Sequence, residues 1–281
     1  MSLANFIQTV FIANILKALE KVHVFADVAN QNYAGNITNL GDKVRIPMIS
    51  DPTIKSFTKN TNLADPEAIS DAVTELVVNQ SGYFNTQVDD SEANQLNLIT
   101  ELQNKAAYKI RDTIDVFMAG LYAQAGLTKG TAAEPIAITS LNVEDVLAEI
   151  AEQMYEANIP AEGRFCIAPP WLHTKLWQAG LTTKTQNDAM YSNGLIGNVA
   201  GFDIRMSTNV SKNSSAWDQS RILFGIKGQS LSVVLKIKSV ENYRPQNRFA
   251  EAVKGLFFYG GKIIRPDMTL CLIADKTAEE E

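Results

Sequence analysis

The pattern of apolar and polar positions divides the chain into helical and extended segments. Near the N-terminus, apolar residues recur at the spacing of an amphipathic helix: Leu3, Phe6, Ile7, Val10, Phe11, Ile15, Leu16 and Leu19. The uncharged part, residues 1–16, is shorter than the ~20 residues that span a bilayer. The first lysine, Lys17, comes too late for a signal peptide. We therefore expect a helix that buries one face on its own core or on another subunit, and no membrane attachment.

Residues 42–80 have the pattern of a long β-hairpin. Two apolar or alternating runs, KVRIPMI at 43–49 and AVTELVVNQ at 72–80, are typical of strands. The segment between them is polar and contains Pro52 and Pro66, which favour turns. Its charges of both signs suit docking on a protein better than binding DNA. Because an isolated hairpin is marginally stable in water, we expect this one to project from the subunit and lean on another surface.

The longest helical pattern follows this hairpin. From Ser91 to Ala119 the chain has neither proline nor glycine, and its apolar residues repeat every three or four positions. They are Leu96, Ile99, Leu102, Ala106, Ile110, Ile114, Phe117 and Leu121. At 1.5 Å per residue, roughly 30 helical residues extend over about 45 Å. The sequence therefore predicts a helix that forms the spine of the subunit.

Three carboxylates lie between the hairpin and this helix, in the stretch SGYFNTQVDDSEANQ (81–95). Asp89, Asp90 and Glu92 could form a metal or acid–base site, but their spacing does not match an EF-hand loop. They fit a helix start better, because an acidic cap residue three positions before a glutamate resembles a capping box. Negative charges also favour the positive end of the helix dipole. The sequence therefore predicts that a strand ends near Val88 and that these three residues cap the long helix.

The second half of the chain mixes helices with largely non-alternating strands. A linker of small residues at 128–135 leads to a predicted helix at 143–158, for which Asn142 or Ser140 is a candidate cap. A buried strand, a Pro-Pro turn and a short helix follow at 164–178, and further strands continue towards the C-terminus. This order favours an α+β fold over a doubly wound sheet.

Composition narrows the possible functions. The 281 residues are 46% hydrophobic and 20% charged, which is ordinary for a globular protein. A formal net charge of −6 excludes a surface that binds nucleic acid mainly by neutralising its phosphates. Cys166 and Cys271 lie in separate apolar runs without a CxxC motif, so we expect two buried thiols and no disulfide.

No motif for catalysis or nucleotide binding is complete. NGLIGNVAG (193–201) lacks the spacing of a phosphate loop, so its glycines indicate a turn or close packing. GLFFYGGKI (255–263) has Gly261 where a Walker loop requires lysine, and its Gly-Gly pair predicts a turn between two apolar strands. The only histidines, His23 and His173, belong to no metal-binding or catalytic pattern. The sequence therefore predicts no active site, metal or cofactor.

Several segments, taken in order, resemble a known family. They are the pattern NYxGxIxxxGDxVxIP at 32–47, the junction YFNTQVDDSEANQ, the strand VAGFDIRMSTN, and the segment ENYRPQNRFAEAVKGLFFYGGKIIRPD. In order and character they are similar to the major capsid (coat) proteins of tailed bacteriophages with the Hong Kong 97 fold. The similarity extends over nearly the whole chain.

The resemblance implies an α+β, Hong Kong 97-like capsid fold with a fixed order of parts. These are an N-terminal arm at 1–41, an extended E-loop hairpin at 42–88, a peripheral (P) domain with spine helix and linker at 89–136, an axial (A) domain at 137–235, P-domain return strands at 236–261, and an A-domain closing strand with an acidic tail at 262–281.

The resemblance also implies a function in assembly. Such subunits form pentamers and hexamers and then an icosahedral shell around double-stranded DNA, in the bacterial cytoplasm, together with a portal. No long scaffolding segment precedes the arm, so a scaffolding protein is expected to be separate or absent. The E-loop of the family lies over a neighbouring subunit, which makes five side chains candidate inter-subunit contacts: Lys55, Phe57, Lys59, Asp65 and Glu67. Some relatives crosslink an E-loop lysine to a neighbour's asparagine, but no partner asparagine is identified here, so we expect non-covalent assembly.

Two alternatives remain open at this point. An encapsulin-type nanocompartment shell has the same fold but encloses cargo enzymes in place of DNA. A soluble α+β enzyme with an unrecognised site near Asp89 and Asp90 would form only small oligomers.

Overall fold

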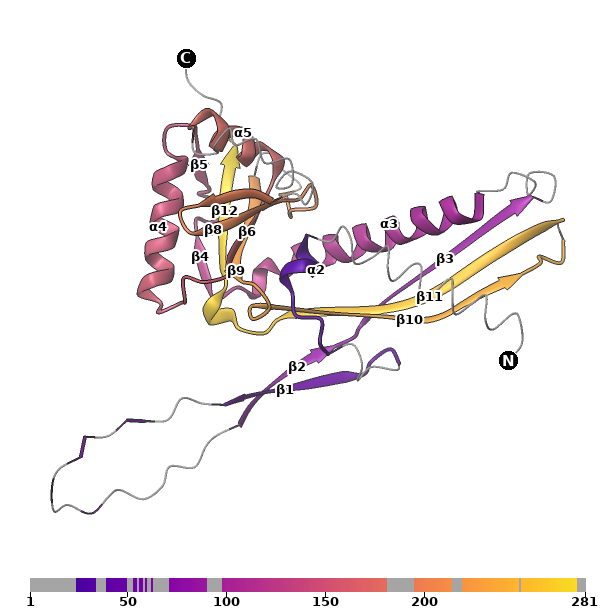
Figure 1. Cartoon of the computed structure of the whole chain (residues 1–281), viewed down its shortest axis with the longest axis horizontal. Coiled ribbons are helices and arrows are strands. Elements are labelled where there is room, and N and C mark those ends of the chain that lie inside the picture. Colours follow the sequence, from indigo (N-terminus) through magenta and orange to yellow (C-terminus); the bar gives the residue numbers. More distant parts are fainter. Residues whose placement is uncertain are drawn as a thin grey trace.

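The computed structural model describes eleven stretches of the chain: residues 24–33, 39–49, 53–54, 56–57, 59, 62, 71–89, 98–180, 195–213, 219–247 and 249–276. Three parts stand out in Figure 1. A compact unit surrounds a mixed sheet, a long three-stranded sheet runs beside helix α3, and a two-stranded hairpin projects from their junction. The mixture of helices and strands confirms the predicted α+β class. The amphipathic helix predicted near the N-terminus lies outside the described residues.

The compact unit is built on a seven-stranded sheet with the order β4-β12-β9-β6-β8-β7, in which β5 also pairs with β12. Its strands are β4 (Leu127–Lys129), β5 (Ile136–Ile138), β6 (Arg164–Ala168), β7 (Leu195–Val199), β8 (Phe202–Met206), β9 (Gln219–Ile226) and β12 (Leu270–Lys276). Alternation of side chains along the strands gives this sheet two buried faces. One face packs under α4 (Val143–Glu156) and α5 (Pro170–Gln178). The opposite face contributes residues to the core around α3.

The three-stranded sheet is antiparallel, with the order β10-β11-β3. Its strands are β3 (Gln80–Asp89), β10 (Leu231–Tyr243) and β11 (Ala250–Ile263). The long helix predicted from the sequence is present as α3 (Leu98–Ala119), and it continues into the short 3-10 helix η2 (Gly120–Gln124). The rings of Phe117 and Tyr259 meet edge to face at 5.3 Å between α3 and β11. One face of this sheet is therefore covered by α3.

Two glycines of this sheet leave room for aromatic rings of the neighbouring strand. A Cβ atom on Gly82 would come 2.3 Å from the ring of Phe257, and one on Gly255 would come 2.3 Å from the ring of Phe84. Both distances are shorter than any real contact of a Cβ atom, so a larger residue would displace the ring. The glycines and rings pair reciprocally across β3 and β11.

The hairpin consists of β1 (Lys43–Ile49) and β2 (Asp71–Val77), paired antiparallel from Lys43 opposite Val77 to Ile49 opposite Asp71. These strands confirm the two extended segments predicted at 43–49 and 72–80. The base of the hairpin packs on the second face of the three-stranded sheet. A small buried cluster joins Leu76 and Val78 to Val234 of β10 and Phe258 of β11.

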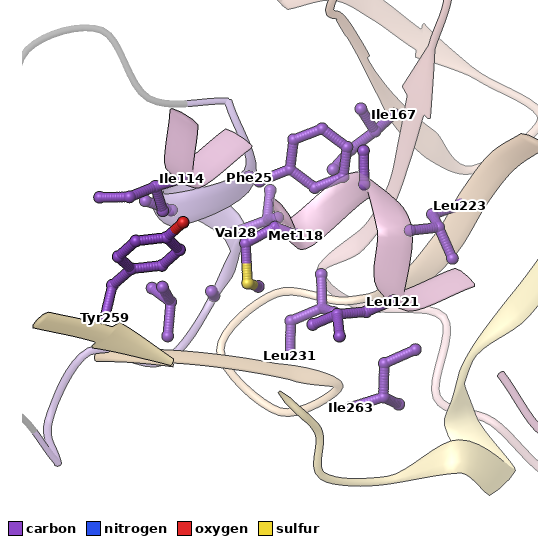
Figure 2. Packing of buried hydrophobic residues seen from close by; sticks show 14 of the residues in the cluster. Phe25, Val28, Ile114, Met118, Leu121, Ile167, Leu223, Leu231, Tyr259 and Ile263 are labelled. Carbon is purple, nitrogen blue, oxygen red and sulfur yellow. The ribbon is translucent and has the colours of Figure 1, made fainter. Parts of the chain in front are cut away.

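One buried cluster joins the parts, and Figure 2 shows its centre. Phe25 and Val28 of helix α2 (Phe25–Val28) lie among Met118 of α3, Leu231 of β10 and Leu223 of β9. The segment is also held by hydrogen bonds, since the Asn30 amide donates to the Leu231 carbonyl at 2.8 Å. Residues 24–33 thus fasten the compact unit to the three-stranded sheet.

The predicted parts and the observed sheets have different limits. β3 pairs with β11, so the range 42–88 predicted for the E-loop contains the hairpin together with one strand of the three-stranded sheet. The range 137–235 predicted for the A-domain begins after β4 and ends inside β10. The short 3-10 helix η3 (Pro266–Met268) links β11 to β12, so the last described strand lies in the sheet of the compact unit.

Three local predictions can be compared with the structure. The helix at 143–158 is confirmed as α4, and Asn142 is its cap residue by position. However, the Asn142 side chain accepts a bond from the Thr139 amide at 2.8 Å and donates to the Ala137 carbonyl at 2.9 Å, so it does not cap the helix. Cys166 and Cys271 are buried free thiols, as predicted, and β9 separates their strands.

Candidate assembly surfaces

The carboxylates at the junction do not form a site within the described residues. Asp89 is the last residue of β3 and lies opposite Ala250, and the described part of α3 begins at Leu98. Asp90 and Glu92 lie outside the described residues, so the predicted helix cap stays a prediction. Over the part of the chain that the structure describes, no three His, Cys, Asp or Glu side chains are grouped as a metal site would require.

The two glycine-rich segments have structural roles. Ala200 and Gly201 have φ angles of 51° and 82°, and they form the tight turn between β7 and β8, which confirms the predicted turn. The second prediction was wrong, because β11 runs without a break through Gly260 and Gly261. A Cβ atom on Gly260 would come 2.7 Å from the Val77 carbonyl oxygen at the hairpin base. On the opposite face, a Cβ atom on Gly261 would come 2.4 Å from the sulfur of Met118. The pair therefore allows close packing on both faces of one strand.

Ionic contacts hold the base of the hairpin. The Glu75 carboxylate accepts a hydrogen bond from Lys43 at 2.9 Å and lies 3.5 Å from the Arg45 guanidinium. The Lys43 ammonium, and to a smaller extent Arg45, lowers the pKa of Glu75 below its ordinary value of 4.5. Lys262 of β11 donates to the Glu75 carbonyl at 3.1 Å. The hairpin is thus fixed to the sheet at its base.

The hairpin tip carries apolar side chains far from this base. Ile54 is 95% exposed and Phe57 is 74% exposed. Lys59 is exposed as well, whereas the other three predicted contact residues, Lys55, Asp65 and Glu67, lie outside the described residues. Two exposed apolar side chains on a projecting element are typical of a protein contact surface.

The far part of the three-stranded sheet exposes further aromatic residues that sequence reasoning missed. Tyr83 of β3 is 81% exposed, and Phe249 beside β11 is 87% exposed. Alternation along β3 shows that Tyr83 and Phe84 point to opposite faces. Alternation alone does not show that α3 covers the face that carries Phe84. The sequence therefore could not show that the face of Tyr83 is the exposed one.

Comparison with known proteins decides the family. A sequence model of the family described as phage capsid protein matches residues 84–267, which extend from β3 to η3. The chain belongs to the phage capsid protein family. It is a phage major capsid protein, a structural subunit of the icosahedral shell of the virion. A comparison with curated proteins finds no match.

Solved structures have the same fold. A chain from Mycobacterium phage Che8 is 24% identical with a TM-score of 0.68, over 89% of this chain and 90% of that one. The capsid protein of Ralstonia phage GP4 is 12% identical with a TM-score of 0.66, over 92% and 93%. A virus-like particle from Pyrococcus furiosus gives 13% identity and a TM-score of 0.56, over 92% and 96%.

Helix α3 is the longest described helix of this capsid protein. No helix in the described stretches combines the length and the apolar character needed to cross a membrane.

Proposed function

We propose that this capsid protein assembles without covalent crosslinks, through pentamers and hexamers, into a Hong Kong 97-like icosahedral shell that encloses double-stranded DNA. In this proposal the β1–β2 hairpin is the E-loop, and the three-stranded sheet with α3 is the P-domain. The seven-stranded unit is the A-domain, and the arm precedes α2. The observation that carries the proposal is the hairpin itself, which is fixed at its base and presents Ile54 and Phe57 to solvent at its tip.

The energetics of the tip favour contact with another subunit. Burial of one large apolar side chain contributes roughly 1.5–3 kcal/mol. A single such contact is weak, but every subunit of a closed shell would repeat it. Repeated weak contacts between linked subunits stabilise an assembly far more than one contact does. The tip therefore suits a shell that is built from reversible steps.

The charge of the protein supports a container for DNA better than a DNA-binding protein. With a net charge of −6, the subunit has no excess of cations with which to hold phosphates. A shell has to confine the packaged DNA without fixing it. We expect assembly in the host cytoplasm with a portal, and with a separate scaffolding protein if one is used.

An encapsulin-type shell is the second candidate. The likeness to a virus-like particle from Pyrococcus furiosus supports a closed shell but does not say what the shell encloses. The family match over residues 84–267 favours the phage shell. Nucleic acid inside purified particles would support the phage shell, whereas enclosed proteins would support the nanocompartment.

Electron microscopy of the purified protein tests the proposal. We expect closed particles, and dissolved particles should give only monomers on a denaturing gel. Removal of residues 52–66 should leave the fold intact by circular dichroism but abolish closed shells. A variant in which the same 15 positions are replaced by a Gly/Ser segment controls for a shortened loop and should also fail to close.

Two results would contradict the proposal. Particles of normal number and size after the deletion would remove the role of the hairpin. Only monomers or dimers of the intact protein, with and without a scaffolding partner, would contradict assembly itself and favour the soluble enzyme. In that case loss of an activity in Asp90→Ala would be the next measurement.

A further inference from the structure

The chain connects the compact unit to the three-stranded sheet at one edge of the seven-stranded sheet. The crossings between the described elements of the two parts enter β4, β9 and β12, which are neighbours in the order β4-β12-β9. The crossings are also bound to one another, since the Gly126 amide donates to the Pro266 carbonyl and the Ile264 amide to the Ser230 carbonyl, both at 2.9 Å. Short connections of this kind are typical hinges. We call residues 125–127, 227–230 and 264–269 the hinge.

The other half of this sheet, formed by β6, β8 and β7, is held by side-chain contacts. Ile204 of β8 belongs to the core under α4 and α5, so alternation along the strand places Arg205 on the opposite face, towards α2 and α3. The Arg205 guanidinium donates to the Asp27 carboxylate of α2. Beyond the end of β8, the Asn209 side chain donates to the Asp112 carboxylate of α3 at 2.9 Å. We call these two contacts, Asp27–Arg205 and Asp112–Asn209, the clasp.

The charge of Arg205 is balanced by Asp27. The Arg205 side chain is 15% exposed and that of Asp27 is 48% exposed. Among the described residues, the Arg205 Nε atom is buried without a hydrogen-bond partner. Loss of the carboxylate would leave a mostly buried guanidinium without its counter-charge, which favours any movement that returns it to water. Lys227 of the hinge lies 3.4 Å from the same carboxylate, so Asp27 links the hinge to β8.

Helix α2 is fixed to the hinge and to the three-stranded sheet by its backbone. The Gly228 amide donates to the Val28 carbonyl at 2.8 Å, and the Val233 amide donates to the Asn30 carbonyl at 3.1 Å. These bonds do not depend on the charge of Asp27. When the clasp is broken, α2 therefore stays in place and the β8 half of the compact unit is the part that can move.

We infer that the compact unit turns about the hinge, and that the clasp holds it in the closed position of this structure. In the open position the β8 half moves away from α2 and α3, and water replaces Asp27 at Arg205. The apolar packing of Val210 beside the clasp opposes this movement, so the open position is the minor one. A half-exposed ion pair contributes little, and the clasp therefore adjusts the population of the open position without abolishing it.

The inference concerns the single subunit and goes beyond the proposed shell. One consequence rests on the proposed function. Pentamers and hexamers built from identical subunits meet at different angles, and a compact unit that turns on its hinge lets one chain fit both.

Modification of thiols measures the opening in the unassembled subunit. Val210→Cys places a thiol beside the clasp at a position that is 4% exposed. Cys271 is a native thiol in the same core, but it lies on the hinge strand β12. Adding Asp27→Asn should make the thiol at position 210 react with a maleimide about two- to fivefold faster, whereas the rate at Cys271 should stay the same. Mass spectrometry of the modified peptides gives both rates in one experiment.

Two further variants complete this measurement. Glu241→Gln is the matched control, because it removes an ion pair of similar exposure within the three-stranded sheet, where Glu241 is 50% exposed and lies 2.8 Å from Lys254. It should change neither rate. Asp112→Ala removes the second contact of the clasp and tests the inference independently of Asp27; it should accelerate only the reaction at position 210.

A distance measurement follows the turn itself. Spin labels are attached to Thr174→Cys on α5 and Ser81→Cys on β3, since both positions are exposed and the native thiols are buried. Pulsed electron paramagnetic resonance should show a broader distance distribution after Asp27→Asn than after Glu241→Gln. An unchanged distribution would overturn the turning movement, even if the thiol at position 210 reacts faster.

The thiol rates give the other decisive outcomes. Equal acceleration at position 210 and at Cys271 would overturn the inference, because Asp27 would then stabilise the whole subunit. Unchanged rates in both Asp27→Asn and Asp112→Ala would overturn it as well. All of these measurements use unassembled subunits, so they leave the proposed shell untouched, whereas the absence of closed particles would contradict the proposed function and not the clasp. If the clasp is confirmed, Asp27→Asn shells should have a wider range of diameters than Glu241→Gln shells by electron microscopy.

Discussion

The compact unit and the projecting hairpin complete their packing in different ways. In the seven-stranded unit, both faces of the sheet are covered by the same chain, and the rings of Phe202 and Phe224 meet edge to face at 5.1 Å in its interior. Single exposed residues such as Leu141 do occur there, as on any protein surface. The hairpin has a buried cluster only at its base, and its tip presents Ile54 and Phe57 to solvent. One part therefore completes its packing within a single chain, whereas the other leaves apolar side chains uncovered, which the proposed contact with a neighbouring subunit would bury.

The largest expected effect is in the interior of the compact unit. Phe224→Ala should lower the free energy of unfolding by about 3–5 kcal/mol, because it leaves a cavity where no neighbour can move in fully. Phe57→Ala should change it by less than about 0.5 kcal/mol, although it weakens assembly. Urea denaturation of the unassembled subunit measures both. A large loss for Phe57→Ala would mean that the tip packs into its own subunit and would break the comparison.

A change at the hairpin base should have an intermediate effect. In Gly260→Ala the new methyl group would meet the Val77 carbonyl and the Val78 backbone, and we expect a cost of about 1–3 kcal/mol. Gly120→Ala is the control, since a Cβ atom there has no neighbour within 4 Å. Denaturation gives the stability, and electron microscopy shows whether the displaced hairpin still closes shells. Equal stability of the two variants would mean that the hairpin does not depend on its close crossing of β11.

The smallest expected effect is the response of the hairpin to acid. Because Lys43 lowers the pKa of Glu75 below 4.5, the ionised carboxylate stabilises the folded hairpin. This contribution is fully present above 4.5, the ordinary value of the unfolded chain, and it is lost as the pH falls through the lower pKa of the folded state. The protection factors of the β1 and β2 amides, which correct for the slower intrinsic exchange at low pH, should therefore fall on acidification in the natural protein. Glu75→Gln should show a weaker pH dependence, with the compact unit as internal control.

An NMR titration of Glu75 provides the check on this last prediction. A pKa at or above 4.5 would remove the proposed role of Lys43 and Arg45. The effect is expected to be small, because Lys43 and Arg45 are exposed and Glu75 is only partly buried, so water screens their attraction.

Elements with a strong local period could be predicted from the sequence. The alternating or apolar runs of β1 and β2 and the repeats in α3 and α4 each indicated the correct type of structure. Local periodicity is sufficient there because each element buries one stripe or face along its own length. Features that depend on a distant partner were missed or misread. The Gly-Gly pair of β11 was predicted as a turn, since nothing near it in sequence indicates that Val77 and Met118 approach it from opposite faces.

The candidate assembly surfaces, too, could be predicted only where the signal is local in the sequence. The sequence identified the polar hairpin and its tip, because turn residues between two apolar strands are a local signal. It did not identify Tyr83 or Leu256, which lie in different strands and become one surface only through the register of β3 and β11.

By itself the sequence determined the elements, the absence of any complete catalytic motif, the likeness to tailed-phage capsid proteins and the acidic charge. Only the tertiary structure decided which face of each strand is covered, how closely the hairpin crosses β11 and where Phe25 and Val28 join the two sheets. The physical reason is that hydrophobic periodicity specifies that a face must be buried. What buries it is decided by the packing of residues that lie far apart in the chain, or by another copy of the chain.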